Sequence, residues 1–459
     1  MHASSRHIAP LYDPAFERDA CGVGLVVDIA GRRSRAILDR ALAGIVNLTH
    51  RGGVGADART GDGAGILTQI PFDLFAATLS EIGASDVGPG DLGVAMTFLP
   101  TDDEGEECCR AALESALAGQ GLRVLGWRPV PTKPDVLGPT ALASLPRIAQ
   151  LLVACPAGLD DAGFERALFL ARRAAERAAT AAGYDENRFF VVSCSARTII
   201  YKGFCLPEDL PAFFLDLQAP RYATAIALFH QRYSTNTFPT WAMAQPFRAI
   251  AHNGEINTVQ GNRRWMEARS TSLALPDGTG GDALQPIVSL AGSDSLSLDN
   301  AIELLTHGGR SLSHALMMLV PEPWEQIADM PAARRAFYDF HAGLIEQWDG
   351  PAALGFSDGV LAGATLDRNG LRPLRYAVTA DGLFVAGSEA GTVEIDQARV
   401  IEKGRLGPGQ MIAVDTRRGV VFRNDELKDE VALRRPYRDW LAAERIRLDL
   451  PADEPEPVV

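Results

Sequence analysis

The stretch CGVGLVVDI, residues 21–29, is the part of the sequence that best indicates the fold. Beyond Gly24 it is a run of apolar and β-branched side chains, which is typical of a buried strand. A periodic apolar pattern from Ala36 to Leu48 predicts an amphipathic helix packed beside that strand. Cys21 therefore stands at the head of a buried strand, directly after a short polar segment.

The other predicted strands fall mainly into two groups. GVAMTFLP and AQLLVACP come first, followed by FFVVS, RTIIYKGF, YATAIALFHQRY and FRAIAHNGE in one group and by LGFSDGVLAGAT, RYAVTADGLFVAG and QMIAVDTRRGVVF in the last third. Asp-Gly pairs favour hairpins in the second group, and helices are predicted at 160–183, 294–307, 311–319, 330–347 and 426–446. Hairpin-connected strands with helices before, between and after them predict an α+β fold of stacked, mostly antiparallel sheets.

Composition and charge exclude several classes of function. The 44 Lys and Arg residues against 58 Asp and Glu residues give a net charge of −14, which disfavours binding to nucleic acid or to an anionic membrane. Residues 1–20 lack the apolar run of a secretory signal, and no later stretch is apolar over the length of a bilayer. Six cysteines without a Cys-x-x-Cys pair predict neither a disulfide framework nor a metal site. We therefore expect a cytoplasmic protein that acts on small molecules or protein partners.

Cys21 can be interpreted in two ways. A cysteine at a strand end is most often a small buried hydrophobic residue. If the chain were cut after Ala20, however, Cys21 would carry both a thiol and an α-amine with a pKa of about 7.7–8.0, close enough to neutrality for the amine to accept the thiol proton. Nucleophile and base would then share one residue, and Gly22 and Gly24 would let a substrate approach the main chain.

Residues far along the chain could complete a site for amide cleavage. AHNGEIN places Asn253 and Gly254 at a strand end, where an amide NH2 and a backbone N–H could stabilise an oxyanion, although Asn-Gly is also a hairpin signal. Arg232 in HQRYSTNTFPTW suits a substrate carboxylate or an ordinary salt bridge. Asp294 in GSDSLSLDN suits an α-ammonium group, or else it or Ser293 is simply a helix N-cap.

Together these motifs resemble a known family. CGVG at Cys21, HRGGVGADARTGDGAGIL, HQRYSTNTFPTW, AHNGEINT, SDS and LDRNGLRP occur in the order found in the glutaminase domain of the large subunit of glutamate synthase. That domain is a class II glutamine amidotransferase, and the resemblance runs from about Cys21 to about Leu448. It implies the four-layer αββα fold of the N-terminal-nucleophile hydrolases, with two stacked and mostly antiparallel sheets.

The resemblance also implies a role for each site residue. Cys21 would be the nucleophile and, through its amine, the base, while Asn253 and Gly254 would form the oxyanion hole. Arg232 and Asp294 would hold the two ends of the glutamine. Thr235 would assist them, and Arg51 would support the nucleophile region.

For the chain as a whole, the resemblance implies a leader at residues 1–20 that is removed, a glutaminase domain at 21–425, and a C-terminal helix with the start of a linker at 426–459. In that family, ammonia passes to a flavin domain and aminates 2-oxoglutarate, with electrons from NADPH, NADH or ferredoxin. FMN, an iron–sulfur cluster and an electron-transfer subunit are therefore implied for the complete enzyme. For this chain we expect glutamine and the synthase part as partners, and no cofactor.

Two alternatives remain open. One is a class II amidotransferase that stands alone and feeds ammonia to another acceptor enzyme. The other is a non-catalytic subunit that keeps its leader, in which case the nitrogen of Cys21 is an amide and cannot act as a base.

Several further features are predicted to be structural. GDGAGI lacks the Gly-Lys-Ser/Thr ending of a phosphate-binding loop. His50, His230 and His252 do not have metal-ligand spacing. The arginines of LDRNGLRP are expected to brace the sheets at a tight turn.

Overall fold

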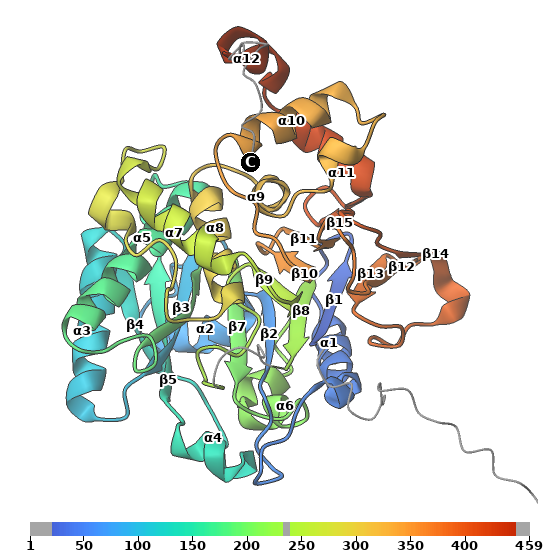
Figure 1. Ribbon diagram of the computed structural model, residues 1–459. Coiled ribbons are helices and arrows are strands. Elements are labelled where there is room, and N and C mark those ends of the chain that lie inside the picture. The colour runs from blue at the N-terminus through green and yellow to red at the C-terminus, as the bar shows by residue number, and fades with distance from the viewer. Residues whose placement is uncertain (1–20, 233–238, 447–459) are drawn as a thin grey trace, which may run out of the picture.

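The computed structural model describes residues 21–232 and 239–446, and within them the strands form three antiparallel sheets (Figure 1). The largest sheet has the order β14 (Val400–Arg405), β12 (Arg375–Thr379), β13 (Leu383–Gly387), β1 (Gly22–Asp28), β8 (Ile226–Gln231), β2 (Ala64–Gln69) and β7 (Thr198–Gly203). The second has the order β16 (Val420–Phe422), β15 (Met411–Asp415), β11 (Leu361–Leu366), β10 (Ala352–Ser357) and β9 (Ile250–Gly254). The predicted strand β1 thus lies in the middle of the largest sheet, between β13 and β8.

The first two sheets stack face to face through their central strands. Val23 of β1, Leu228 of β8 and Ala353 of β10 are buried in one apolar core. The sheets approach so closely that a Cβ on Gly355 would lie 2.6 Å from Cδ1 of Leu228 and 3.1 Å from Cγ1 of Val23. Glycine at position 355 is therefore required by the contact between the sheets.

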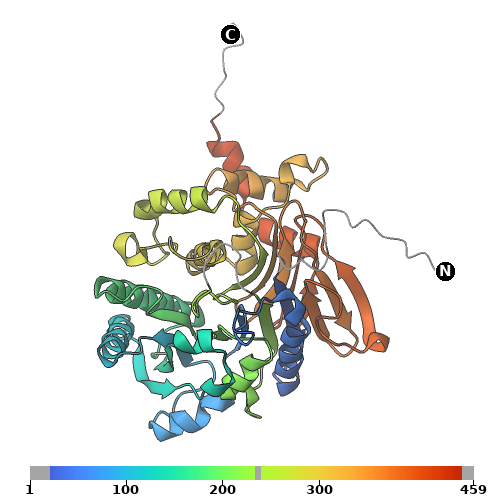
Figure 2. The ribbon, with the colours of Figure 1, turned by 60° about the horizontal axis from the view of Figure 1, so that its bottom comes forward.

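Helices cover the outer faces of this pair of sheets. α1 (Arg35–Asn47) packs on β1 and β8, and in Figure 2 this blue helix lies beside the orange strands of the same sheet. On the other side α8 (Asp294–His307), α9 (Leu312–Leu319), α10 (Ala332–Ala342) and α11 (Asn424–Ala432) share a second apolar core with β9, β10 and β15. The predicted αββα layering is confirmed.

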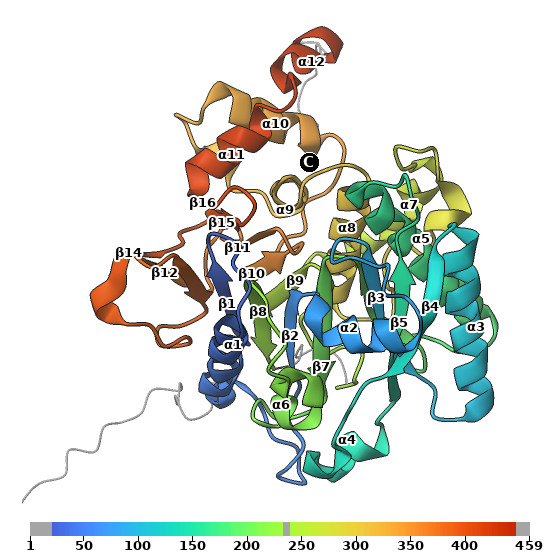
Figure 3. The same cartoon turned by 180° about the vertical axis from the view of Figure 1, so that it is seen from behind.

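The third sheet has the order β4 (Arg123–Pro129), β5 (Arg147–Ala154), β3 (Leu92–Leu99) and β6 (Phe190–Ser195). α3 (Asp103–Gly119) and α5 (Asp161–Ala181) pack against it around a core of their own, as Figure 3 shows from behind. The remaining helices are α2 (Phe72–Glu81), α4 (Pro139–Ala143), α6 (Asp209–Phe213), α7 (Val259–Arg269) and α12 (Tyr437–Glu444). In the described ranges, no helix has the length and apolar character needed to cross a membrane.

The prediction of one continuous helix over 426–446 is wrong. The chain forms α11 and α12, separated at residues 433–436. Pro436 stands immediately before α12, where it cannot donate the hydrogen bond that a helix interior needs. The predicted helix over 330–347 is also too long, because α10 ends at Ala342.

Candidate active site

Cys21 lies directly before β1, at the end of the strand pair that β1 forms with β8. Gly22 pairs with Gln231 across these strands, so Cys21 and Arg232 are the next residues on two adjacent strands. Only 7% of the Cys21 surface is exposed. The predicted nucleophile is therefore a buried thiol beside the predicted carboxylate-binding arginine.

The surroundings of Cys21 determine its protonation. Burial raises the pKa of the thiol to about 11, against an opposing effect of the Arg232 and Arg372 cations, and the Asp294 carboxylate raises it further. A thiol with this pKa stays protonated at neutral pH. Attack on an amide by Cys21 therefore requires a base that takes its proton.

The backbone at Arg232 is held in an unusual conformation. Its φ is 87°, a region that non-glycine residues rarely adopt, and its N–H donates to the carbonyl of Gly63 at 3.0 Å. Its Nε lies 3.9 Å from Oδ2 of Asp62. Such a conformation costs about 1–3 kcal/mol and persists only where the surroundings enforce it, here the glycine-rich segment 51–67.

Asn253 and Gly254 end strand β9 and pair with Ala353 and Ala352 of β10. Because 97 residues separate β9 from β10, the interpretation of Asn-Gly as a hairpin turn is wrong. Asn253 is 1% exposed, and its Oδ1 has no hydrogen-bond partner in the described part of the chain. Gly254 has a φ of 141°, and a Cβ there would lie 1.8 Å from the carbonyl oxygen of Pro351. Asn253 therefore keeps a buried amide oxygen without a partner among the described residues, and Gly254 stands where a side chain would clash with the backbone.

At the start of α8, the helix N-cap and the predicted ammonium-binding carboxylate are two different residues. Ser293 is the N-cap, since its Oγ accepts the N–H of Leu296 at 3.1 Å. Asp294 is the first helical residue, and its carboxylate accepts the N–H groups of Ile256 and Ser295, each at 2.7 Å. The buried carboxylate of Asp294 thus lies beside the segment that follows Asn253 and Gly254.

Arg51 is connected to strand β1 through the segment that contains Ser388 and Glu389. Its Nε donates to Oε2 of Glu389 at 2.8 Å, and His50 pairs with the other carboxylate oxygen at 2.7 Å. The neighbouring Ser388 donates its N–H to the carbonyl of Val23 at 2.9 Å and accepts the N–H of Val23 on its Oγ at 3.3 Å. Arg51 is therefore linked to strand β1 through Glu389 and the neighbouring Ser388.

Thr235 lies outside the described residues. Arg372, which was expected only to brace the sheets, places its charge near Cys21 and His252, and it lowers the pKa of both side chains. Nothing in the turn motif LDRNGLRP distinguishes Arg372 from its neighbour Arg368, which pairs with Asp349 at 2.5 Å.

The histidines beside the site are buried and neutral. Nε2 of His230 lies 3.0 Å from the carbonyl oxygen of His252, and Nδ1 of His252 lies 2.7 Å from Oγ of Ser295. Burial lowers the pKa of His230 to about 3. No group of three or more metal-ligating side chains occurs in the ranges 21–232 and 239–446.

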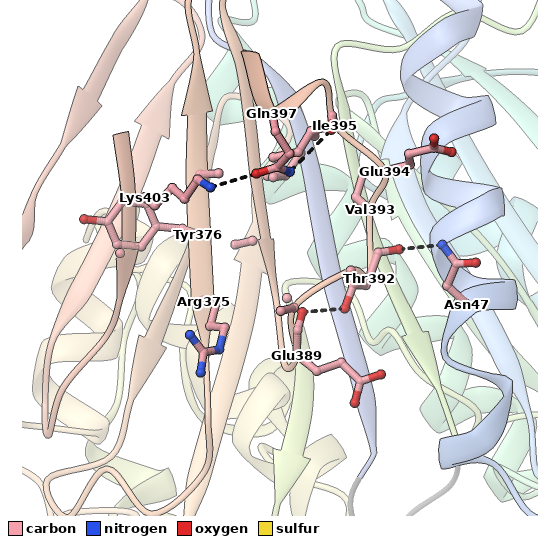
Figure 4. Close-up of a pocket in the computed structure, with 17 residues that line it drawn as sticks. Asn47, Arg375, Tyr376, Glu389, Thr392, Val393, Glu394, Ile395, Gln397 and Lys403 are labelled. Atoms are coloured by element: carbon pink, nitrogen blue, oxygen red, sulfur yellow. Dashed lines mark hydrogen bonds between the residues drawn. The ribbon is translucent and has the colours of Figure 1, made fainter. Parts of the chain in front are cut away.

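A cavity of about 570 Å³ does not have Cys21 in its lining. It is formed by the end of α1, strands β12 to β14 and the loop 389–397 (Figure 4). Nδ2 of Asn47 donates to the carbonyl of Thr392 at 3.1 Å, and Nζ of Lys403 donates to Oε1 of Gln397 at 2.7 Å. None of the predicted catalytic or substrate-binding residues lines it, so this cavity is not the predicted active site.

The chain is similar to known proteins over most of its length. The model of the family described as "Glutamine amidotransferases class-II" matches residues 21–440. The large chain of NADPH glutamate synthase from Azospirillum brasilense is 43% identical over 444 residues, covering 96% of this chain and 29% of that protein. Ferredoxin-dependent glutamate synthase 2 from Synechocystis sp. is 44% identical over 434 residues, covering 94% of this chain and 27% of that protein.

A solved structure, the glutamine phosphoribosylpyrophosphate amidotransferase from B. subtilis, matches with a TM-score of 0.30 and 13% identity, covering 79% of this chain and 49% of that one. That likeness is too weak to support an argument. This chain spans less than a third of the length of the two glutamate synthases that it matches.

Proposed function

The chain belongs to the class II glutamine amidotransferases, and from that premise we propose that it hydrolyses the side-chain amide of glutamine to glutamate and ammonia with Cys21 as the nucleophile. One observation supports this most directly. The buried thiol of Cys21 lies at the end of a central strand beside Arg232, within range of the Asp294 charge. Segments more than two hundred residues apart in sequence therefore converge on one sulfur atom.

We propose that the α-amine of Cys21, freed by removal of residues 1–20, is the base. An α-amine has a pKa of about 7.7–8.0, so part of it is unprotonated at neutral pH and can accept the proton of a thiol whose pKa burial has raised. The thiolate then attacks the amide carbonyl of glutamine. The α-ammonium returns the proton to the leaving nitrogen, ammonia departs, and water hydrolyses the thioester to glutamate.

Asn253 and Gly254 suit stabilisation of the oxyanion that forms in this attack. They lie at one end of β9, and the φ of Gly254 places its backbone in a conformation closed to other residues. Arg232 would bind the α-carboxylate of glutamine and Asp294 its α-ammonium group. Thr235 would assist in substrate binding, and Arg51 would act as a positioning residue through the loop that holds β1.

We further propose that the ammonia is used in a glutamate synthase. The relatives with this activity are several times longer than this chain, so amination of 2-oxoglutarate would be carried out by a synthase domain or subunit. FMN, the iron–sulfur cluster and the NADPH, NADH or ferredoxin donor would be bound there. The domain division follows: a leader at 1–20, the glutaminase domain at 21–425 and a connecting segment at 426–459, in a cytoplasmic protein.

Glutamate release from glutamine tests this function. Cys21→Ala is expected to abolish it, because no other thiol replaces the nucleophile. Cys108→Ala, a change at a half-buried cysteine on α3, is the matched control and should leave the rate unchanged. Wild-type turnover in Cys21→Ala would contradict the proposal.

A further inference from the structure

A second polar cavity, of about 450 Å³, lies at the end of the molecule's central elements opposite the proposed active site. α5, β6, the C-terminal end of α8, the N-terminal end of α9 and the end of β10 contribute to its walls. Asp294 and His307 are the first and last residues of α8, and a helix of that length separates them by about 20 Å. The cavity is therefore distinct from the glutamine site.

Positive charge is concentrated around this cavity. Five arginines line it, against three carboxylates: Arg166, Arg197, Arg248, Arg310 and Arg434, with Glu165, Glu303 and Asp358. The chain as a whole carries 58 acidic residues and 44 basic ones. The positive charge around the cavity therefore does not follow from the overall composition of the chain.

Three of the five arginines have carboxylate partners: Arg166 lies 3.8 Å from Asp277, Arg248 lies 3.3 Å from Glu176, and Arg434 lies 3.0 Å from Glu430. The excess of positive charge therefore rests on Arg197 and Arg310. Glu303 is already engaged by Arg172, whose Nη2 lies 2.9 Å from its Oε2, while Nη1 of Arg248 is 3.5 Å from the same oxygen. Asp358 accepts the N–H groups of Val360 and Leu361 at 2.9 and 2.7 Å. Neither carboxylate forms an ion pair with Arg197 or Arg310 among the residues that the structure describes.

Glu165 likewise accepts neutral donors. The Ser195 hydroxyl and the Ala196 N–H donate to its Oε1 at 2.9 and 2.7 Å. Burial raises the pKa of the Glu165 carboxyl, although the Arg197 cation opposes that effect. Glu165 therefore accepts hydrogen bonds from Ser195 and Ala196 and forms no ion pair with an arginine within the described ranges.

Arg310 and Arg197 have guanidinium groups without a hydrogen bond or ion pair inside the described ranges. Burial lowers the pKa of Arg310, as expected for a cation that lacks a compensating anion. Arg310 directly precedes Ser311, the N-cap of α9, and Nη1 of Arg434 donates to the Ser311 hydroxyl at 2.8 Å. The N-terminus of α9 adds a partial positive charge at the same wall.

Two buried polar atoms of the lining are also without partners. Oγ of Ser193 and Nε of Arg248 make no hydrogen bond within the described structure. Ser193 is 2% exposed, and the Arg248 side chain is 8% exposed. Buried donors are rarely left unsatisfied, so a bound acceptor would remove an unfavourable feature of the cavity.

We propose that this arginine cavity binds a small oxyanion that carries at least two negative charges, such as a phosphate compound or a polycarboxylate. Arginine is suited to both, since its planar donors match the spacing of carboxylate and phosphate oxygens. Arg197 and Arg310 supply the charge that the protein leaves uncompensated. The site does not depend on the glutaminase function, because no residue is shared between the two.

Calorimetric titration of the full chain with inorganic pyrophosphate, and separately with citrate, tests the proposal and distinguishes the two chemistries. Binding of either anion is expected, whereas acetate at matched ionic strength should bind at least tenfold more weakly. Arg310→Gln and Arg197→Gln should each weaken binding at least tenfold. Arg264→Gln, a change at an exposed arginine on α7, should not.

Arg310→Lys keeps the positive charge and should recover part of the lost affinity if its fold is intact. Thermal unfolding of each variant shows whether it is folded. The proposal is overturned if neither anion binds the folded wild-type chain, or if the folded Gln variants bind as tightly as wild type.

Discussion

Replacement of Asp294 by Asn tests whether this residue binds substrate or merely begins a helix. The carboxylate accepts two backbone N–H groups at 2.7 Å, from Ile256 and Ser295. Asn is nearly the same size but offers one carbonyl oxygen, so one of these donors would face an NH2 group. The unsatisfied donor should cost about 1–3 kcal/mol of unfolding free energy.

The effect on catalysis is expected to be separate and larger. A charged hydrogen bond to the substrate α-ammonium contributes about 1.5–3 kcal/mol, which corresponds to a loss of roughly 10- to 150-fold in kcat/KM. Most of it should appear in KM, because the α-ammonium does not change during the reaction. Ser293→Ala removes only the N-cap and should cost about 0.5–2 kcal/mol of stability while leaving KM unchanged.

The assay compares glutamine with 4-carbamoylbutanoate, which has the same side-chain amide and no α-amine. Wild type should prefer glutamine strongly, and Asp294→Asn should lose most of that preference. Ser293→Ala serves as the structural control and should retain it. If folded Asp294→Asn kept the wild-type preference for glutamine, Asp294 would not bind the ammonium group.

Three other outcomes are expected. Gly254→Ala should abolish glutaminase activity and lower the melting temperature, because the new Cβ would lie 1.8 Å from the carbonyl oxygen of Pro351. A wild-type kcat in this variant would refute the role of Gly254 in stabilising the oxyanion. With residues 1–20 attached, alkylation of Cys21 by iodoacetamide should accelerate about tenfold per pH unit towards its pKa of about 11, and a plateau below pH 9 would contradict the burial argument. Burial lowers the pKa of His314 to about 3 and of His341 to about 4 in the folded chain. As pH drops below about 6.5, these histidines therefore take up protons in the unfolded chain but not in the folded one, and the melting temperature should fall. His341→Gln should reduce that fall, and an equal fall in the variant would exclude this histidine as its cause.

The central part of the fold was predictable because local pattern and tertiary environment agree there. The apolar run after Gly24 is buried on both faces, so its sequence identifies strand β1 without reference to its neighbours. The break between α11 and α12 was missed although Pro436 marks it in the sequence. Assignment of β3 and β5 to a separate sheet was not predictable, since strand pairing depends on contacts that periodicity does not encode.

The same distinction applies to the site. Residue types and motif order indicated Cys21, Asn253 and Asp294. Only the structure shows that Ser293 caps α8, while the Asp294 side chain accepts the N–H of Ile256. The pairing of Arg51 with Glu389 joins residues 338 positions apart, which no local signal reveals. The arginine cavity likewise arises from scattered positions.

We propose that the thiol of Cys21 and a free α-amine belong to the same residue in the active enzyme. Intact mass spectrometry of the protein, fractionated by glutaminase activity, tests it most directly. Every active fraction is expected to contain a chain that begins at Cys21. A fully active fraction in which all molecules retain Met1–Ala20 would contradict it.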